Sequence, residues 1–348
     1  MNDLLEFDPT GPVLIVGGYG TVGTALTQLI GPQWPLLLTG RNPGKGSHLA
    51  SGNVSVDRWD LGQPEPFAAK VRAVISTVND PDDRVLRAAV GAGIPYVDLT
   101  RWTSRVTRAI AQAALLRPAA PVLLSSGWMG GVTNIVAAAL ADEVRGADSI
   151  DVAIRYDIND RAGVDSVDFM DRLGLNFEVR KGGKAAVVRP LTDARWVDIA
   201  GHRTKVARFD TPEQFTLPLT LGAGSVATRI GFSSRTSTTA LLAASAAGLF
   251  RWGSGERWAP LRRSLLYSPG SGGTAHIRID VTGPGGTRTA VISDPQGQAH
   301  LTAVGGFLGL HNVMSSHATP GVSFPESAPD HGSALAKLES HGVTILRS

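Results

Sequence analysis

The sequence predicts an α/β protein in two parts: a doubly wound parallel sheet, and a second α+β domain built on a mainly antiparallel sheet. Three observations carry this prediction. The first third of the chain alternates short, continuously apolar runs with helical segments. A turn with four glycines in seven positions joins the first apolar run to the first helix. From Ser149 onward, apolar and polar residues alternate, as in strands that bury one face. A length of 348 residues also favours two domains.

The first part is predicted to repeat a strand-and-helix unit. Short strands consist of continuous apolar residues when helices cover both faces of their sheet. The runs that fit this are Val13–Val16, Pro35–Thr39, Ala73–Val78, Pro95–Leu99 and Pro121–Ser125, and Val54–Asp60 is predicted as a further strand. Helices are predicted at Thr21–Ile30, Asp82–Ala92 and Thr103–Leu116. This repetition is typical of a parallel, doubly wound sheet.

The pattern changes near residue 146. The segment "SIDVAIRYDI" is predicted as a strand, and "NFEVRKGGKAAVVRPL" and "TAHIRIDVTG" through "TRTAVISD" as two hairpins with glycine-containing turns. Helices are expected at Thr238–Phe250 and Ala299–Ser316. We therefore predict a first domain over residues 1–133, a second domain over 134–300, and a C-terminal helix and tail over 301–348 that return to the first domain.

The glycine turn "VLIVGGYGTVG" is the most informative stretch of the chain. Gly17 and Gly18 allow a tight turn out of the first strand. Gly20 lacks a Cβ, so that backbone can approach a pyrophosphate, and Gly23 lets the helix pack closely. The pyrophosphate would then sit on free N–H groups at the positive end of the helix. Strand, turn and helix together predict a Rossmann-type dinucleotide-binding domain; the alternative is a glycine-rich turn that holds nothing.

The end of the second strand indicates which dinucleotide binds. NAD-binding domains place an acid there for the ribose 2′-hydroxyl, whereas this chain has "LLLTGRN", with Arg41 at that place. A guanidinium suits a 2′-phosphate, and Gly40 would give the phosphate room, so we predict NADP(H). Asp60 is placed either to approach the adenine or to cap a following helix. The remaining predicted cofactor-binding residues are Tyr19, Thr21, Val22, Asn42, Thr77, Val78 and Asn79.

Composition excludes several classes of function. The chain has no cysteine, which rules out disulfides and a thiol nucleophile and fits a reducing cytoplasm. Its net charge of +3 comes from scattered arginines rather than a basic stripe, so we expect no nucleic-acid partner. No signal sequence or long apolar run predicts a membrane segment. The eight histidines are dispersed without metal-ligand spacing, and no G-x-S-x-G motif is present, so neither a metal site nor a serine hydrolase is predicted.

The chain resembles the saccharopine dehydrogenase-like reductases. The segments that carry the resemblance are "VLIVGGYGTVG", "TGR", "YVDLT", "SSGWMGGVTNIVAAALA" and "TPGVSFPE". They cover the first 140 residues well and the last 50 loosely. The resemblance implies a second domain inserted between the parts of a Rossmann domain, and NAD(P)H-dependent chemistry, often at a C=N bond. Many relatives have Pro-Gly where this chain has Gly130-Gly131, which leaves the shape of the substrate pocket open.

Several residues carry over from this resemblance. It implies cofactor glycines at Gly17, Gly20 and Gly23, a 2′-phosphate contact at Arg41, and a nicotinamide contact at Thr77 and Val78. It also implies a homodimer formed through the sheet of the second domain. The predicted substrate-binding residues are Asp98, Arg101, Trp128 and His311.

The predicted catalytic residues are Tyr156 and Asp168, because hydride transfer to C=N or C=O needs a proton donor or a substrate that is already cationic. The alternatives are a half-buried sheet tyrosine and an aspartate on a solvated helix face. His311 has the alternative of a core histidine. Arg101 and Arg229 are candidates to clamp a substrate carboxylate, or else face water.

The predicted function is a cytoplasmic NADP(H)-dependent reductase of a small imine or carbonyl compound. Two alternatives remain open. One is a reductase of C=C bonds or of carrier-tethered intermediates. The other is a protein that senses NADP(H) and performs no chemistry.

Overall fold

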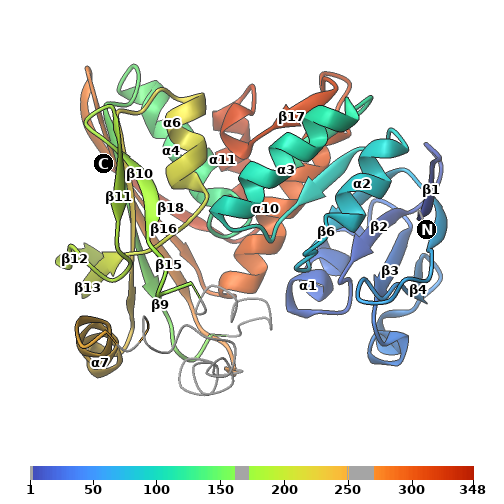
Figure 1. Cartoon of the computed structure of the whole chain (residues 1–348), viewed down its shortest axis with the longest axis horizontal. Coiled ribbons are helices and arrows are strands. Elements are labelled where there is room, and N and C mark those ends of the chain that lie inside the picture. The colour runs from blue at the N-terminus through green and yellow to red at the C-terminus, as the bar shows by residue number, and fades with distance from the viewer. Residues whose placement is uncertain (1–2, 161–171, 249, 251–269) are drawn as a thin grey trace. The chain divides into compact units, whose positions relative to one another are not determined.

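The computed structural model describes residues 3–160, 172–248, 250 and 270–348 (Figure 1). The chain forms two compact units. The first unit comprises Met1–Gly131 and Thr302–Ala328, and the second comprises Val132–Leu301 and Pro329–Ser348. The predicted C-terminal segment is therefore divided: its first part belongs to the first unit and its last twenty residues to the second.

The first unit is built on a parallel sheet of seven strands among its described residues. Their order is β17-β8-β7-β6-β2-β3-β4, so the strand order reverses at β2. The strands are β2 (Val13–Val16), β3 (Leu36–Gly40), β4 (Val54–Arg58), β6 (Ala73–Ser76), β7 (Tyr96–Asp98), β8 (Pro121–Leu124) and β17 (Gly321–Ser323). Ligands of such sheets bind at the carboxyl ends of the strands, beside the point of reversal. The predicted doubly wound parallel sheet is confirmed.

Helices cover this sheet and explain why its central strands are continuously apolar, whereas the edge strand β4 is largely exposed. They are α1 (Thr21–Ile30), α2 (Arg84–Gly91), α3 (Thr103–Leu116) and α10 (Gln298–Val313). All four residues of β2 are at most 1% exposed. Two glycines let α10 approach closely: a Cβ on Gly306 would lie 2.7 Å from Leu99, and one on Gly309 would lie 2.8 Å from Leu123.

Two smaller features of the first unit were not predicted. A parallel pair joins β1 (Leu4–Phe7) to β5 (Ala68–Val71) outside the main sheet. Two short 3₁₀ turns, η1 (Pro43–Lys45) and η2 (Ser47–Leu49), follow β3, and η4 (Pro325–Ser327) follows β17.

The second unit is built on a mainly antiparallel sheet of seven strands, ordered β12-β13-β14-β9-β15-β16-β18 within the described residues. The strands are β9 (Ser149–Tyr156), β12 (Arg195–Ile199), β13 (His202–Arg208), β14 (Ser225–Phe232), β15 (Ala275–Gly283), β16 (Gly286–Asp294) and β18 (Thr344–Arg347). Only the pair β14 and β9 is parallel among them. Both predicted hairpins are confirmed, the first as β10 (Phe177–Lys181) and β11 (Lys184–Val188) and the second as β15 and β16.

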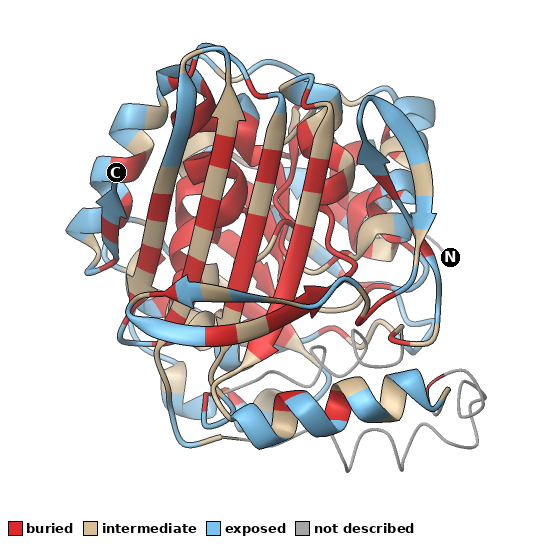
Figure 2. Cartoon of the chain, turned by 90° about the vertical axis from the view of Figure 1, so that its left-hand side faces the viewer, coloured by how far each residue is buried: buried red, intermediate tan, exposed pale blue. Residues whose placement is uncertain are grey.

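The two faces of this sheet differ. One face packs on α4 (Val132–Glu143), which contacts β15 and β16, and α6 (Glu213–Thr220) contacts β14. Helix α11 (His331–Ser340) packs in turn on α4. Figure 2 looks onto the sheet and shows buried positions alternating with half-buried ones along the strands, with the β12–β13 hairpin crossing in front. Helix α7 (Arg235–Ala246) contacts β13 and β14.

Candidate functional site

Two glycines of the turn between β2 and α1 are required by the packing of the chain itself. Gly17 has a φ of +84°, and a Cβ there would overlap the side chains of Thr77 and Val78. A Cβ on Gly23 would overlap the carbonyl oxygen of Gly17 and would lie 2.6 Å from the Cα of Gly18. The first turn of α1 therefore lies directly on the backbone of the loop, as predicted for these positions.

Gly20 differs from these neighbours. It has an ordinary φ of −79°, and a Cβ on it would come within 4 Å only of the Gly17 carbonyl oxygen, at 3.2 Å. The packing of the chain alone thus gives weak reason for a glycine, and the missing Cβ leaves open space on the outside of the loop. That space is where a Rossmann-type loop brings its backbone to a pyrophosphate.

The first turn of α1 presents, beside this space, backbone N–H groups for which the described residues supply no acceptor. The first hydrogen bond of the helix runs from Thr24 N to Gly20 O at 2.9 Å, so the N–H groups of Thr21, Val22 and Gly23 precede it. The helix has no acidic residue in its first turn and no side-chain cap. The positive end of the helix dipole is therefore uncompensated, which suits an anion such as a diphosphate.

The end of strand β6 lies next to the glycine loop. β6 pairs with β2 in parallel, and Thr77 donates from both its backbone N and its Oγ1 to Val16 O, each at 2.9 Å. Together with the contact of Thr77 and Val78 with Gly17, this joins the predicted nicotinamide-end residues to the glycine loop. Asn79, the next residue, accepts a hydrogen bond from Arg105.

The aromatic ring of Tyr19 occupies the space that two glycines leave. A Cβ on Gly40 would lie 2.7 Å from the Tyr19 ring and hydroxyl, and one on Gly46 would lie 2.6 Å from Tyr19 Cδ1. The expectation that Gly40 makes room for a phosphate was therefore wrong, because the tyrosine fills that room. Burial raises the pKa of Tyr19, and the nearby guanidinium groups of Arg41 and Arg58 oppose this rise.

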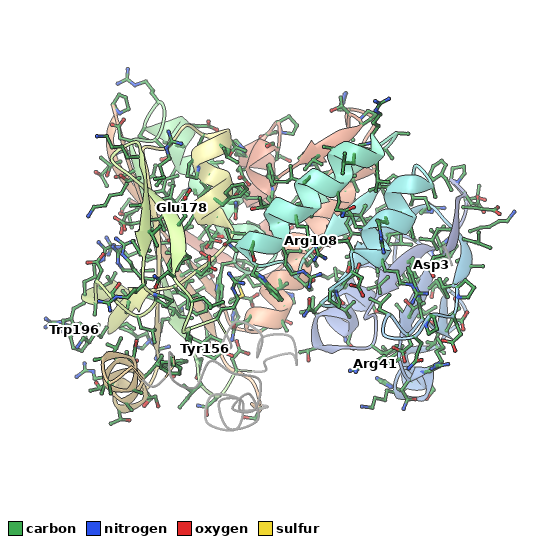
Figure 3. The ribbon with its side chains drawn as sticks, viewed as in Figure 1. Asp3, Arg41, Arg108, Tyr156, Glu178 and Trp196 are labelled. Carbon is green, nitrogen blue, oxygen red and sulfur yellow. The ribbon has the colours of Figure 1, made fainter. Side chains whose placement is uncertain are left out.

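Arg41 lies on the loop after β3, at the surface of the first unit (Figure 3). Among the described residues it makes no hydrogen bond or ion pair, so its guanidinium is available to a ligand. Asn42 accepts from Gly44 N at 3.1 Å and so shapes the η1 turn. Asp60 accepts from Gly62 N at 3.1 Å and pairs with Arg58 at 3.6 Å; it closes a turn rather than capping a helix.

Asp98 and Arg101 form part of a buried ionic cluster. Arg101 Nε donates to Asp98 Oδ2 at 2.7 Å, its Nη1 donates to Asp83, and Tyr96 donates its hydroxyl to Asp98 Oδ2 at 2.5 Å. Burial opposes the charge on Arg101, yet the carboxylates of Asp98 and Asp83 hold its pKa above the ordinary value. Burial also raises the pKa of Tyr96 strongly. Both residues predicted to face a substrate are thus engaged with each other.

Sequence reasoning missed two further arginines of this cluster. Arg108 donates from Nε to Asp83 Oδ2 at 2.6 Å, and the Arg105 guanidinium lies 5.1 Å from the Trp102 ring. Burial lowers the pKa of Arg105, and the Arg101 charge adds to this. Arg105 and Arg108 are three residues apart and so lie on one side of α3, and Arg101 lies four residues before Arg105, just ahead of the helix; this spacing in "RWTSRVTR" is the sequence signal that indicates them.

Two other predicted substrate residues lie in the first unit. The His311 ring packs on α10 between Phe307, at 4.5 Å, and Trp34, at 5.0 Å. Trp128 is half-buried in the loop before α4. In that loop Gly130 has a φ of +63°, which a proline cannot adopt. A proline at position 130 would therefore not fit this turn.

The catalytic candidates belong to the second unit. Tyr156 ends β9, and its ring packs edge-on against Phe232 at 5.7 Å (Figure 3). Asp168 lies outside the described residues. Arg229 neither faces water nor is free to clamp a ligand: it is 5% exposed and donates to Asp151 and Asp193, each at 2.6 Å.

In the part of the chain that the structure describes, no three His, Cys, Asp or Glu side chains gather as a metal site would require. Within that same part, no helix is long and apolar enough to cross a bilayer.

No protein-family model matches the sequence, and no curated protein matches it. Solved structures give distant matches over the whole chain. A myo-inositol dehydrogenase from Corynebacterium glutamicum is 11% identical, with 99% of each chain covered and a TM-score of 0.42. A scyllo-inositol dehydrogenase from Lactobacillus casei with bound NAD(H) and scyllo-inositol is 13% identical, with 97% of this chain and 99% of the other covered and a TM-score of 0.43. Likenesses at this level carry no argument about activity.

Proposed function

We propose that the protein is an NADP(H)-dependent oxidoreductase of the saccharopine dehydrogenase-like type that reduces a C=N or C=O bond of a small metabolite. The observation that carries the proposal is the loop around Gly20. Gly20 has no side chain, although the packing of the chain would nearly tolerate a Cβ there. The N–H groups of Thr21, Val22 and Gly23, which have no acceptor among the described residues, lie beside the space that this leaves.

The residues fit a dinucleotide phosphate in three places. The N–H groups of Thr21–Gly23 would hold the pyrophosphate, and Arg41, without a partner among the described residues, would hold the 2′-phosphate. Thr77 and Val78, at the end of β6, would lie beside the nicotinamide. When bound, NADPH supplies a hydride from this ring. The residues of the chain would bind and orient it, with the loop backbone on its pyrophosphate at the switch point of the sheet.

A proton donor is required only for some substrates. A protonated imine is already an electrophile, so positioning alone can suffice, whereas a ketone needs an acid near its oxygen. Tyr156 is the described residue that we propose for this role, and Asp168 remains the second candidate. The Tyr156 ring packs edge-on against Phe232, and a ketone substrate would require that its hydroxyl, at the end of that ring, reach the carbonyl oxygen.

Two wider proposals accompany this function. The outer face of the second-unit sheet carries half-buried polar side chains such as Asp280, while Arg278 there donates to Asp198 O of the β12–β13 hairpin at 3.3 Å; we place the contact of a homodimer on the part of this face that the hairpin leaves uncovered. The absence of cysteine supports a reducing cytoplasm as the location.

The test is a fluorescence titration of the full chain with NADPH and with NADH. Gly20→Val should abolish binding while the variant stays folded, because the added methyl groups would fill the space of the pyrophosphate. Gly52→Val is the matched control, since Gly52 lies in the same unit and a Cβ there would meet nothing within 4 Å. Unchanged NADPH affinity in Gly20→Val would refute the proposal.

Turnover decides among the reactions. NADPH consumption is measured against a panel of imines, ketones, enones and thioester-linked enoyl compounds. Turnover of imines or ketones supports the proposal. Turnover of enones alone would indicate a C=C reductase, and tight binding with no turnover would indicate an NADP(H) sensor.

A further inference from the structure

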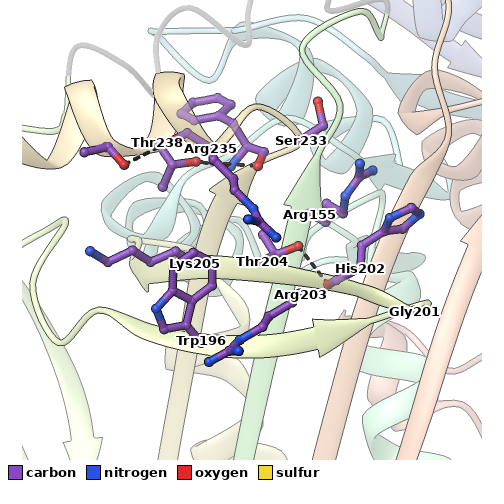
Figure 4. A pocket seen from close by; sticks show the side chains of 12 residues that line it. Arg155, Trp196, Gly201, His202, Arg203, Thr204, Lys205, Ser233, Arg235 and Thr238 are labelled. Atoms are coloured by element: carbon purple, nitrogen blue, oxygen red, sulfur yellow. Dashed lines mark hydrogen bonds between the residues drawn. The ribbon is translucent and has the colours of Figure 1, made fainter.

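The second unit contains a basic pocket of about 310 Å³, formed entirely by its own residues. It lies where the β12–β13 hairpin crosses the ends of β9 and β14, next to the first turn of α7 (Figure 4). Its lining residues are Arg155, Trp196, Gly201, His202, Arg203, Thr204, Lys205, Phe232, Ser233, Arg235, Thr238 and Thr239.

Four fixed positive charges line this pocket and no carboxylate does. Three of them are arginines and the fourth is Lys205. Within the described residues, none of the four forms an ion pair with an acid. Two acids lie at the edge of the pocket and are hydrogen-bonded to its lining: Asp157 accepts from Ser233 Oγ at 3.3 Å, and Asp198, opposite Arg203 in the hairpin, accepts from Gly201 N at 3.1 Å.

An indole ring holds two of the guanidinium groups in place. Arg203 lies 5.4 Å and Arg235 lies 5.7 Å from the centre of the Trp196 ring, which is itself 47% exposed. Figure 4 shows both arginines beside this ring, with Lys205 and Arg155 on either side of Thr204. A cation–π contact restrains a guanidinium without using its N–H groups, which stay free for an oxyanion.

The hydroxyl groups of the lining are largely used by the chain. Thr204 Oγ1 donates to His202 O at 3.1 Å, Thr239 Oγ1 to Arg235 O at 2.9 Å, and Thr238 Oγ1 accepts from Phe232 N at 3.0 Å. The cationic groups, rather than the hydroxyl groups, would therefore select the ligand of this pocket. Like charges gathered without a counter-ion repel one another, and an anion in the pocket relieves that repulsion.

We propose that the basic pocket binds a small molecule with two or more phosphate groups. The volume lies at the lower end of the range for small-ligand sites, about 300–1,000 Å³, which fits a diphosphate or a small bisphosphate. Planar guanidinium groups bind phosphate oxygens in pairs, and Lys205 adds a point charge. The site is separate from the glycine loop and does not depend on the proposed dinucleotide function.

The test uses inorganic pyrophosphate and isothermal titration calorimetry on the full chain. Pyrophosphate can also bind the glycine loop, so the titration is made in the Gly20→Val background. We expect one site per chain in that background, whose affinity falls about tenfold or more in Arg155→Gln/Lys205→Gln, because charge-assisted hydrogen bonds are lost. The matched control is Arg180→Gln/Lys184→Gln, which removes the same charges from the exposed β10–β11 hairpin.

The outcomes separate this site from the dinucleotide site. Arg155→Gln/Lys205→Gln with an intact loop should bind NADPH as the parent does, and should melt at a similar temperature. No pyrophosphate binding in the Gly20→Val background, or equal loss in the control variant, would overturn the proposal. So would displacement of pyrophosphate by a short RNA or by anionic lipid vesicles at lower concentration, since the patch would then bind a macromolecular surface.

Discussion

The carboxylate of Asp98 accepts a hydrogen bond from Arg101 Nε at 2.7 Å, and the two residues are only 1% and 2% exposed. Asp98 ends β7 and Arg101 precedes α3, so the pair links a central strand to its following helix. A buried ion pair adds little net stability compared with a well-packed apolar pair, but removal of one partner leaves the other as an uncompensated buried charge. The structure thus makes this pair a support for the end of the sheet where the glycine loop lies.

Removal of the Asp98 charge should therefore be costly. We expect Asp98→Asn to lower the free energy of unfolding by about 3–5 kcal/mol, as for other broken buried pairs. The measurement is urea unfolding followed by circular dichroism. Glu6→Gln is the control, because Glu6 pairs with Lys70 at 3.0 Å at the surface and should cost less than about 1 kcal/mol. Similar losses in both variants would show that burial does not set the energy of the Asp98 pair.

The ion pair between Asp3 and Arg84 predicts how the free energy of unfolding changes with pH. Burial raises the pKa of Asp3, but the hydrogen bonds from Arg84 and Phe67 N outweigh it and hold the pKa below the ordinary 3.8. The lowered pKa stabilises the folded chain above the unfolded value, and this contribution is lost as the pH falls through the folded value. The difference in unfolding free energy between the parent and Asp3→Asn should be constant from pH 7 to about pH 5 and shrink below about pH 4. A difference that grows on acidification would contradict this assignment.

The glycine loop allows a sharper comparison between structure and binding. Gly23→Ala would push a methyl group into the backbone of Gly17 and Gly18, and should cost about 1–3 kcal/mol of stability or more. Gly20→Ala should leave the melting temperature almost unchanged and weaken NADPH binding. Thermal unfolding and a titration of the same two variants check this. If Gly20→Ala destabilises the chain as much as Gly23→Ala does, the open space beside Gly20 is not a ligand site.

Arg41 should decide which cofactor is preferred. Arg41→Asp replaces a free guanidinium with a charge that repels a 2′-phosphate, so the ratio of NADH to NADPH dissociation constants should fall by at least about tenfold. Arg87→Asp is the control, because Arg87 is another exposed arginine of the first unit without an ion pair among the described residues. A ratio that stays constant in Arg41→Asp would remove Arg41 from the site.

The sequence predicted those parts of the fold whose signal is local. Helices α1 and α3 begin and end at the predicted residues; β2 does so too, and the other five predicted strands of the first unit differ from prediction by one or two residues at an end, whereas β17 was not predicted. The central strands β2, β6 and β7 are buried along their whole length, so each of these apolar runs carries its own evidence. The pair β1 and β5 was not predicted, because its residues are largely exposed and its partners are 64 residues apart. The addition of β18 to β16 likewise depends on a pairing that no local pattern records.

The candidate site divides in the same way. The contact of Gly17 with Thr77 and Val78 follows from two neighbouring parallel strands, which the sequence indicates. The burial of Arg101 by Asp83 does not, because it requires the packing of α2 on α3. The Tyr19 ring fills the space beside Gly40 that was expected to hold a phosphate. This placement depends on the path of a loop, which no local pattern indicates.

Substitution of Tyr156 tests whether this residue donates a proton or only packs in the sheet. If its hydroxyl protonates the substrate, Tyr156→Phe should lower kcat about a hundredfold or more for a ketone and much less for a protonated imine, while KM changes little. The ring and its edge-on contact with Phe232 are preserved in this variant, so stability should hold. Phe232→Leu is the converse control, since it removes the edge contact and keeps the hydroxyl. Steady-state kinetics on both substrates check the prediction. Parent-like rates in Tyr156→Phe, together with destabilisation in Phe232→Leu, would assign the pair to the packing of β9 on β14 and leave the reaction to positioning alone.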